Sequence, residues 1–453
     1  MPCNVVIIGR PNVGKSTLFN RLAGKKLALV DDAPGVTRDR REAVGKLGDL
    51  AFTIVDTAGW ENVRDQSLEA RMRAETEKAV QDADLCLFVI DARAGVTAAD
   101  KEFGEMLRRR SKQVILLANK SESDKAAAGA LEAFEMGLGA PILISAEHGE
   151  GLGELYAAME PYCAARGDLG EKGGDPAELR PIRFAVIGRP NVGKSTLINT
   201  LINEPRMLTG PEAGITRDSI GVDWRWSDGE RDWPIRLFDT AGMRRKAKVR
   251  EKLEKLSVSD SLRAIRFAEI VLLLIDAQAP FEKQDLQIAD LAIREGRCVV
   301  LVVNKWDLVN DKAAAWKELR AQAERLLPQI EGVPMIAVSA LNGGGVEEIV
   351  PQAIGAYRHW NARIKTPDLN RWLGEAVASH PPPAPGGRRL KLRYMAQTKT
   401  RPPTFVVMCS RPDELPASYK RYLVRGIRKA FELPGTPIRI ILRKPKNPYA
   451  PSS

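Results

Sequence analysis

Short apolar runs alternate along this chain with longer segments of helical periodicity. In the first third of the chain, the apolar runs cover residues 5–8, 51–55, 85–90, 114–118 and 142–144. Nearly every position in these runs is apolar, which is typical of strands that are buried on both faces. We therefore predict an α/β fold in which helices cover both sides of a mixed, mainly parallel sheet.

This pattern occurs twice because the sequence repeats itself. Residues 9–18 recur letter for letter as residues 188–197, and later matches follow in the same order with slowly growing offsets. Ordered matches of this kind indicate a duplicated domain with loop insertions. The first insertion falls at residues 227–229, where Asp-Gly between two strand-like runs predicts a hairpin turn and hence one antiparallel edge.

The predicted boundaries give three domains. The two copies cover residues 1–165 and 181–360, and residues 166–180 form a linker rich in glycine and charge. A small α+β domain follows at residues 361–453, with the order helix, strand, strand, helix, strand. Its second helix, residues 417–432, has an apolar stripe that predicts a core-facing side, formed by Tyr419, Tyr422, Leu423, Ile427, Ala430 and Phe431.

Positive charge is concentrated in this last domain. The formal net charge is +11, and residues 361–453 contain 19 Lys and Arg against 5 Asp and Glu. A concentrated basic field attracts polyanions, of which nucleic acid is the commonest in cytosol, and a solvated basic face is the alternative. We predict RNA contacts from Arg421, Arg425 and Arg428, which line up at helical spacing. The sequence of this domain has no Gly-x-x-Gly clamp for a single strand.

Two segments have the spacing of a phosphate-binding loop. Residues 9–16 and 188–195 both read Gly-x-x-x-x-Gly-Lys-Ser, and each follows an apolar strand and begins a helix. In that context, backbone N–H groups surround phosphate oxygens at the positive end of the helix. The lysines would bridge the β- and γ-phosphates, and the serines would bind Mg²⁺.

A second motif predicts the base. In Asn304-Lys305-Trp306-Asp307, the carboxylate can accept hydrogen bonds from N1 and N2 of guanine, whereas adenine offers no matching pair of donors. The first copy reads Asn119-Lys120-Ser121-Glu122, so its carboxylate must fold back by one methylene group to reach the same hydrogens. We predict guanine at both sites. The asparagines would contact the N7/O6 edge, and a backbone N–H near Ser145 or Ser339 would meet O6.

Further matches between the copies predict a switch. Thr37 and Thr216 stand 22 residues after the phosphate-loop lysines, as expected for a hydroxyl that joins Mg²⁺ only while the γ-phosphate is present. Asp56 and Asp239 would hold the metal through a bound water molecule, and Gly59 and Gly242 would donate an N–H to the γ-phosphate.

The residues that follow these glycines are Trp60 and Met243, which cannot orient an attacking water by hydrogen bonds. Slow intrinsic hydrolysis or another water-positioning device follows. Asn12 and Asn191 are candidates for binding a monovalent cation beside the phosphates, and stabilisation of the loop is the alternative. The basic run at residues 244–250 would either contact RNA or an acidic partner in one nucleotide state or form a solvated loop.

The candidate residues fall into groups by role. The catalytic candidates are Lys15, Thr37, Lys194 and Thr216. The metal ligands would be Ser16, Thr37, Asp56, Ser195, Thr216 and Asp239. The nucleotide contacts would come from Asn12, Val13, Gly14, Lys15, Ser16, Thr17, Asp56, Gly59, Asn119, Lys120, Glu122, Ser145, Asn191, Val192, Gly193, Lys194, Ser195, Thr196, Asp239, Gly242, Asn304, Lys305, Asp307 and Ser339.

With these motifs in place, the sequence resembles the bacterial tandem GTPase family called Der or EngA, which assists assembly of the large ribosomal subunit. The match covers almost the whole chain, including both phosphate loops, the paired Thr-Arg-Asp loops, the basic run, and residues 402–405 and 435–440. The resemblance implies a KH-like fold after about residue 361, hydrolysis of GTP to GDP, binding of rRNA and the large subunit, and potassium-stimulated activity through Asn12 and Asn191.

We therefore predict a GTP-hydrolysing switch that assists ribosome assembly. The alternative is an RNA-binding scaffold in which one nucleotide site is a permanently filled structural element; a tRNA-modifying GTPase is disfavoured because no cysteine-based catalytic group accompanies the sites. The apolar runs are too short to span a bilayer, and no basic region precedes an apolar stretch at the N-terminus. We expect a cytoplasmic monomer with reduced, mostly buried cysteines.

Overall fold

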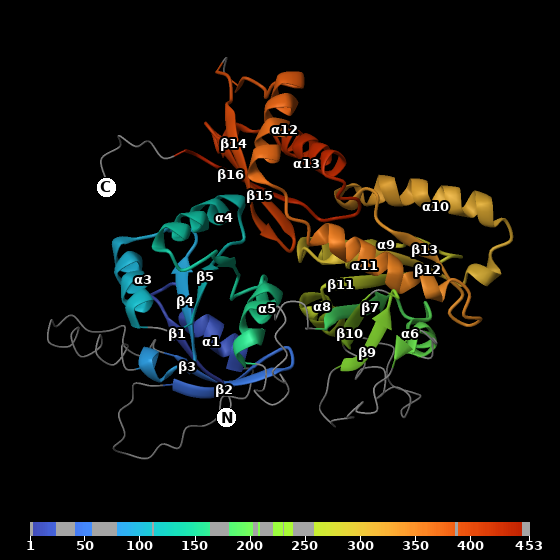
Figure 1. Ribbon diagram of the computed structural model, residues 1–453, viewed down its shortest axis with the longest axis horizontal. Coiled ribbons are helices and arrows are strands. Elements are labelled where there is room, and N and C mark those ends of the chain that lie inside the picture. Colours follow the sequence, from blue (N-terminus) through green and yellow to red (C-terminus); the bar gives the residue numbers. More distant parts are fainter. Residues whose placement is uncertain are drawn as a thin grey trace. The chain divides into compact units, whose positions relative to one another are not determined.

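A computed structural model describes residues 3–23, 41–56, 79–110, 113–163, 181–202, 207–208, 221–229, 231–238, 258–385 and 388–445. The chain divides into two units, Met1–Lys172 and Gly173–Ser453 (Figure 1). The predicted linker, residues 166–180, lies outside the described residues. The division into domains at residue 360 stays a proposal, because the second unit contains both the second copy and the C-terminal domain.

The first unit contains a mixed sheet whose order, among the described residues, is β2-β3-β1-β4-β5-β6. Only the β2–β3 pair in this order is antiparallel, and the other neighbours are parallel. The strands match the predicted runs to within about two residues at each end. Their bounds are β1 Cys3–Ile8, β2 Arg41–Leu47, β3 Leu50–Asp56, β4 Leu85–Asp91, β5 Val114–Asn119 and β6 Ile142–Leu143.

Helices accompany the strands of the first unit. The bounds of those that the structure describes are α1 Lys15–Ala23, α3 Ala98–Arg110, α4 Asp124–Ala130, the 3₁₀ helix η2 Leu131–Met136 and α5 Leu152–Cys163. Helix α4 begins where the Ser123 hydroxyl accepts a hydrogen bond of 3.2 Å from the backbone N–H of Ala126, which caps its first turn. No helix in the described part of the chain is long and apolar enough to cross a membrane.

The second unit repeats this sheet in the order β13-β12-β11-β7-β10-β9-β8, as far as the structure describes it. The strands are β7 Ile182–Gly188, β8 Met207–Leu208, β9 Gly221–Ser227, β10 Asp232–Phe238, β11 Ile270–Asp276, β12 Cys298–Asn304 and β13 Met335–Ala337. The predicted hairpin at residues 227–229 is confirmed: β9 and β10 are antiparallel, and Asp228 accepts a 2.7 Å hydrogen bond from the backbone N–H of Arg231.

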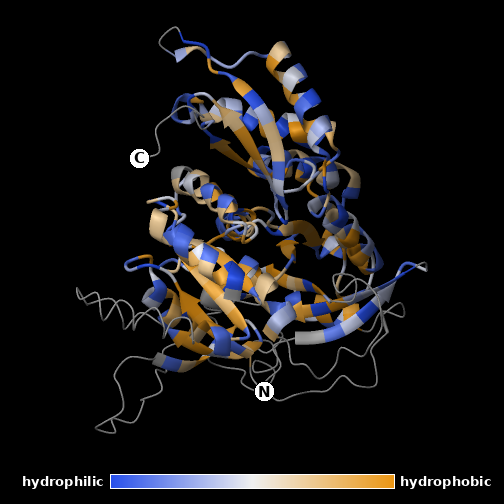
Figure 2. Ribbon diagram, turned by 60° about the vertical axis from the view of Figure 1, so that its left-hand side comes forward, coloured by the Kyte–Doolittle hydropathy of each residue, from blue (hydrophilic) through white to orange (hydrophobic). Residues whose placement is uncertain are grey.

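Helices cover both faces of the second sheet. Alternate residues of β7 belong to different core clusters: Phe184 and Val186 to one, Ala185 and Ile187 to the other. The central strands are apolar on both sides for this reason, and they are largely hydrophobic in Figure 2. The helices are α6 Lys194–Ile202, α8 Val258–Phe267, α9 Lys283–Arg294, η3 Trp306–Leu308, α10 Lys312–Leu326, η4 Pro328–Ile330, η5 Val346–Glu348 and α11 Ile349–Trp360.

The C-terminal domain has the predicted α+β order. Strand β15 lies between β14, which is antiparallel to it, and β16, which is parallel. The predicted apolar stripe faces the core through Tyr419, Leu423 and Ile427, whereas Ala430 is exposed. The elements are α12 Thr366–Ser379, β14 Leu392–Thr400, β15 Pro403–Cys409, η7 Pro412–Glu414, α13 Ala417–Ala430 and β16 Arg439–Arg443.

The cysteines depart from expectation at one pair. Cys3 at the start of β1 and Cys163 at the end of α5 form a disulfide, with their Cα atoms 5.1 Å apart, so the prediction of reduced thiols was wrong for these two residues. The sequence gives no sign of this pairing, because 160 positions separate the two residues and only the fold brings them together. Cys86, Cys298 and Cys409 are buried thiols, as predicted.

Candidate nucleotide sites

Each phosphate loop leaves the carboxyl end of a strand that lies inside its sheet, β1 in the first unit and β7 in the second. Ligands of α/β sheets bind at this edge. The loops require glycine because they pack closely against an asparagine: a Cβ added to Gly14 would lie 2.2 Å from Nδ2 of Asn119, and one added to Gly193 would lie 2.3 Å from Nδ2 of Asn304. Both glycines also have positive φ angles, +95° and +96°.

The two lysines of these loops fold back over the loop backbone. The ammonium group of Lys15 donates to the carbonyl of Arg10 at 2.9 Å, and that of Lys194 donates to the carbonyls of Gly188 at 2.9 Å and Arg189 at 2.6 Å. Each lysine is also the first residue of its helix, so the serine and threonine that follow lie in the first turn of α1 or α6. Positive side chains and helix N-termini together favour bound phosphate.

Asn12 and Asn191 have left-handed backbone conformations, with φ angles of 65° and 63°. Asparagine tolerates this region better than most residues do, so its presence in both loops has a conformational reason. The geometry thus supports the alternative in which these residues stabilise the loop. Binding of a cation by their side chains stays a proposal.

Asn119 and Asn304 join the phosphate loop to the base loop in their units. Asn119 donates to the carbonyl of Val13 at 2.8 Å and accepts from the backbone N–H of Ala146 at 2.8 Å. Asn304 does the same with Val192 at 2.7 Å and Ala340 at 2.9 Å. Both side chains are buried, and their amide groups therefore hold the two loops in a fixed relation.

Two aspartates that the sequence analysis missed complete this arrangement. Asp91 at the end of β4 pairs with Lys120 at 2.7 Å, and Asp276 at the end of β11 pairs with Lys305. Burial acts to raise the pKa of Asp91, but hydrogen bonds from Lys120 and from backbone N–H groups outweigh it, so this pKa lies below its usual value. A signal was present in the sequence: Ile-Asp-Ala at residues 90–92 recurs at residues 275–277.

Another missed pair anchors the phosphate loops to the next helix. Arg10 contacts Asp100 of α3 at 3.2 Å, and Arg189 contacts Asp285 of α9 at 3.0 Å. Both aspartates are almost fully buried, and burial raises the pKa of Asp285 even though Arg189 opposes the shift. The arginine of each Gly-Arg-Pro-Asn loop thus fixes the loop from its outer side.

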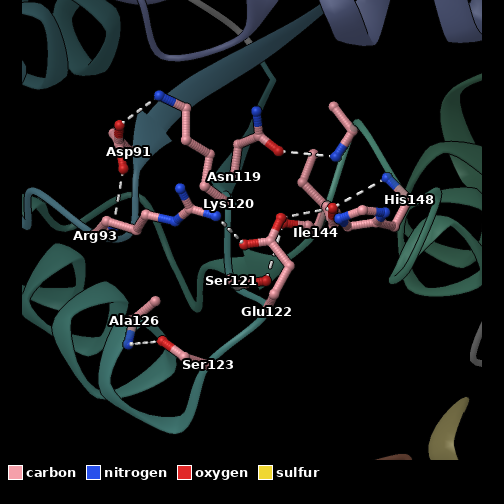
Figure 3. Close-up of polar contacts among 12 residues, drawn as sticks. Asp91, Arg93, Asn119, Lys120, Ser121, Glu122, Ser123, Ala126, Ile144 and His148 are labelled. Atoms are coloured by element: carbon pink, nitrogen blue, oxygen red, sulfur yellow. Dashed lines mark hydrogen bonds and ion pairs between the residues drawn. The ribbon is translucent and has the colours of Figure 1, made fainter.

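The two base sites differ at the residue expected to bind guanine. In the first unit, the Glu122 carboxylate accepts from the Ser145 hydroxyl at 2.7 Å. It also accepts from the Arg93 guanidinium at 3.0 Å, as Figure 3 shows. Burial acts to raise the pKa of Glu122, but the contacts with Ser145, its own backbone and Arg93 outweigh this effect and lower it. Asp307 is exposed and makes no hydrogen bond or ion pair with the described part of the second unit.

The predicted metal ligands are only partly described. Asp56 ends β3, is 1% exposed, and stands in register with Ile7 near the start of the phosphate loop, where a metal ligand is needed. The closely packed glycine of the phosphate loop, the Lys15 ammonium group and the buried Asp56 carboxylate fit a magnesium–nucleotide complex in the first unit. Several residues singled out in the sequence lie outside the described part of the chain: Thr37, Gly59, Trp60, Thr216, Asp239, Gly242, Met243 and the basic run 244–250.

The sequence matches known proteins along its whole length. Residues 4–120 and 183–305 match the family model described as 50S ribosome-binding GTPase. Residues 363–443 match the C-terminal KH-domain-like model of EngA bacterial GTPase enzymes. GTPase Der of Parvibaculum lavamentivorans is 57% identical over 471 residues, which cover 99% of both chains. The chain belongs to the Der (EngA) family of GTPases.

Of two more comparisons, one agrees with this membership and the other adds no weight to it. GTPase Der of Ruegeria pomeroyi is 57% identical over 99% of this chain and 96% of the relative. The solved structure of Era in complex with MgGDPNP and nucleotides 1506–1542 of 16S ribosomal RNA matches at 19% identity and a TM-score of 0.30, over 58% of this chain and 93% of that chain. A TM-score this low adds no weight to the assignment.

Membership in the Der family confirms the predicted fold class, with two P-loop GTPase domains and a KH-like domain. It also confirms that the chain is a GTPase, which uses a guanine nucleotide and Mg²⁺. The closely packed glycines and the lysines of the phosphate loops in both units agree with this class of enzyme.

The three arginines predicted to contact RNA do not share one environment. Arg428 is 7% exposed, and its guanidinium donates to the carbonyls of Gln329 and Thr436 at 2.6 and 3.2 Å. Arg425 is ion-paired with Glu331 at 2.8 Å, and this pairing lowers the pKa of Glu331. A common phosphate-binding stripe is therefore not formed, because two of its members contact the second GTPase domain instead. Arg421 is exposed.

Proposed function

We propose that this chain is a GTP-driven switch that associates with the large ribosomal subunit and assists its assembly. The observation that carries the proposal is the recurrence of one arrangement in both units: a lysine over the phosphate loop, and an asparagine that joins this loop to the base loop. The relatives named GTPase Der and the family description 50S ribosome-binding GTPase support the ribosomal part.

In this proposal, residues of the chain divide the work on GTP between them. Lys15 and Lys194 bind the β- and γ-phosphates, and Asn119 and Asn304 position the loops that contact guanine. Mg²⁺, when bound by the serine, threonine and aspartate ligands predicted above, neutralises charge on the phosphate oxygens. Loss of the γ-phosphate then releases Thr37 and Thr216, and their segments change conformation.

Hydrolysis in this scheme is slow without further positive charge near the phosphates. Trp60 and Met243 occupy the positions after Gly59 and Gly242. Trp has only an N–H donor and Met only a weak acceptor, so neither can both donate to and accept from an attacking water. We propose that K⁺ binds beside Asn12 and Asn191 and stabilises charge that develops in the transition state. Replacement of KCl by NaCl is the direct comparison for this part of the proposal.

Lys15→Ala and Lys194→Ala should each slow single-turnover GTP hydrolysis at their own site about 100-fold, because each removes a positive group from the transferred phosphate. Lys101→Ala and Lys317→Ala, at exposed positions of the two units, are matched controls and should leave the rates unchanged. The rival interpretation is a scaffold with one structural nucleotide. It would be supported if either phosphate-loop variant left both hydrolysis and co-sedimentation with large subunits at wild-type levels.

We propose that exposed basic side chains of the KH-like domain bind RNA. Arg388, Arg389, Lys391 and Arg393 are four exposed cations within six positions that lead into and begin β14, and Arg421 is exposed on α13. Closely spaced cations of this kind neutralise successive phosphates.

Replacement of Arg389, Lys391 and Arg393 by glutamine should flatten the salt dependence of rRNA binding. The slope of log K against log salt should fall by about 2 to 3, since each lost phosphate contact removes about 0.7 to 0.9. The measurement is a filter-binding titration at several KCl concentrations. Arg425→Gln is the matched control and should keep the wild-type slope, because this arginine is paired with Glu331. An unchanged slope in the triple variant would place the RNA elsewhere.

A protein with this role would work where ribosomes assemble, so we propose a cytoplasmic location. We also propose that it acts as a monomer. The proposal that GTP controls association is tested by sedimentation with large subunits in GDP and in a non-hydrolysable GTP analogue; equal association in the two nucleotides would contradict it.

A further inference from the structure

The base site of the first unit contains an ion pair that has no counterpart among the described residues of the second. Arg93 follows β4, and its guanidinium contacts Oε2 of Glu122 at 3.0 Å (Figure 3). The equivalent residues of the second copy are Gln278, which follows Asp276 by two positions as Arg93 follows Asp91, and Asp307. A longer acid and an arginine therefore occur together in one copy, and a shorter acid and a neutral side chain occur together in the other.

We infer that Arg93 is a positioning residue for guanine recognition in the first unit: it holds the longer Glu122 side chain folded, so that its carboxylate meets the base. The inference rests on the proposed guanine site and names what makes glutamate usable there. Glutamate has one more rotatable bond than aspartate. Arg93 and Ser145 contact different oxygens of Glu122, at 3.0 and 2.7 Å, and together they fix that bond.

Arg93 is itself held in place from its backbone. Its N–H donates to Oδ1 of Asp91 at 2.9 Å, and Oδ2 of the same aspartate accepts from Lys120 at 2.7 Å. Lys120 also donates to the carbonyl of Asn12 at 2.7 Å. The backbone from which the Arg93 side chain extends is therefore linked to the phosphate loop and to the base motif. This fixes the position of the Arg93 Cα relative to Glu122.

The contacts leave capacity for the base. A carboxylate has about four acceptor positions, and Arg93 and Ser145 occupy one on each oxygen of Glu122. The backbone N–H of Glu122 is a third contact. One position therefore remains for a hydrogen of guanine, and the second hydrogen of the base replaces this local backbone contact. Arg93 is 63% exposed and Glu122 is 23% exposed, so the pair contributes modestly by itself and acts mainly by limiting the rotation of Glu122.

The test measures nucleotide binding to the full-length chain that carries Lys194→Ala. A stoichiometry of one GDP per chain is the check that only the first site binds nucleotide. GDP and inosine diphosphate are compared by calorimetry, because hypoxanthine lacks the 2-amino group of guanine. Arg93→Gln should weaken GDP about threefold to tenfold, the effect of leaving one side chain to be ordered on binding. The GDP-to-IDP preference should fall with it, whereas a general loss of structure would weaken both nucleotides equally.

Three further variants sharpen the result. Arg93→Lys, which keeps the charge, should recover part of the preference. In a Glu122→Asp background, Arg93→Gln should change nothing, because the extra bond is gone. Arg109→Gln, an exposed arginine of the same unit, is the matched control. Unchanged or tighter GDP binding in Arg93→Gln would overturn the inference. Failure of the parent chain to prefer GDP over ADP would instead reject the guanine site itself.

Discussion

Replacing Asn304 by alanine should lower the free energy of unfolding of the second unit by about 2–4 kcal/mol and weaken its guanine-nucleotide binding about 100-fold. The variant leaves the carbonyl of Val192 and the backbone N–H of Ala340 without their buried partner. Each unsatisfied buried group costs about 1–3 kcal/mol. The binding loss follows because this side chain holds the phosphate loop and the base loop in register.

Tryptophan fluorescence during urea unfolding measures the stability change of the second unit. Seven of the eight tryptophans lie in the second unit, and only Trp60 lies in the first. Asn310→Ala, at an exposed position of the same unit, is the control and should change stability by less than about 0.5 kcal/mol. Asn119→Ala should affect nucleotide binding in the first unit and leave the tryptophan transition in place. An Asn304→Ala chain with wild-type stability would show that the two loops are held by other contacts.

Arg428→Ala should destabilise the second unit by about 2–4 kcal/mol, because it removes a buried group that bridges two domains. The guanidinium joins the carbonyl of Gln329, in η4 of the GTPase domain, to that of Thr436 in the KH-like domain. Burial desolvates the charge of this arginine and so lowers its pKa. Truncation leaves the buried carbonyl of Thr436 and the part-buried carbonyl of Gln329 without this donor.

Calorimetry should then show the KH-like domain melting before the GTPase domain to which it is joined. Gly435 helps to make this interface: its N–H donates to the carbonyl of Glu331 at 2.9 Å, and an added Cβ would lie 2.7 Å from the Cα of Val333. Arg421→Ala is the matched control, an exposed arginine on the same helix, and should change stability by less than about 0.5 kcal/mol. If Arg428→Ala lost RNA affinity at full stability, the original prediction of an RNA contact would be restored.

Helical spacing could place Arg421, Arg425 and Arg428 on one helix but could not say what they face. Glu331, the partner of Arg425, and Gln329, a partner of Arg428, lie 94 and 99 residues away from them along the chain. The same limit explains Cys3 and Cys163. Local periodicity is a property of neighbouring residues, whereas a contact across the fold depends on the path of the whole chain.

The sequence by itself determined the strands, the duplication, the phosphate loops and the family, because each depends on residue type and spacing over a few positions. The Asp91–Lys120 pair could have been found from the repeated Ile-Asp-Ala, since duplicated sites retain matching residues. Only the tertiary structure decided that Asn119 and Asn304 join two loops, that Arg93 meets Glu122, and that Arg428 is buried. These are contacts between residues of different loops or domains, and they depend on how the complete fold packs.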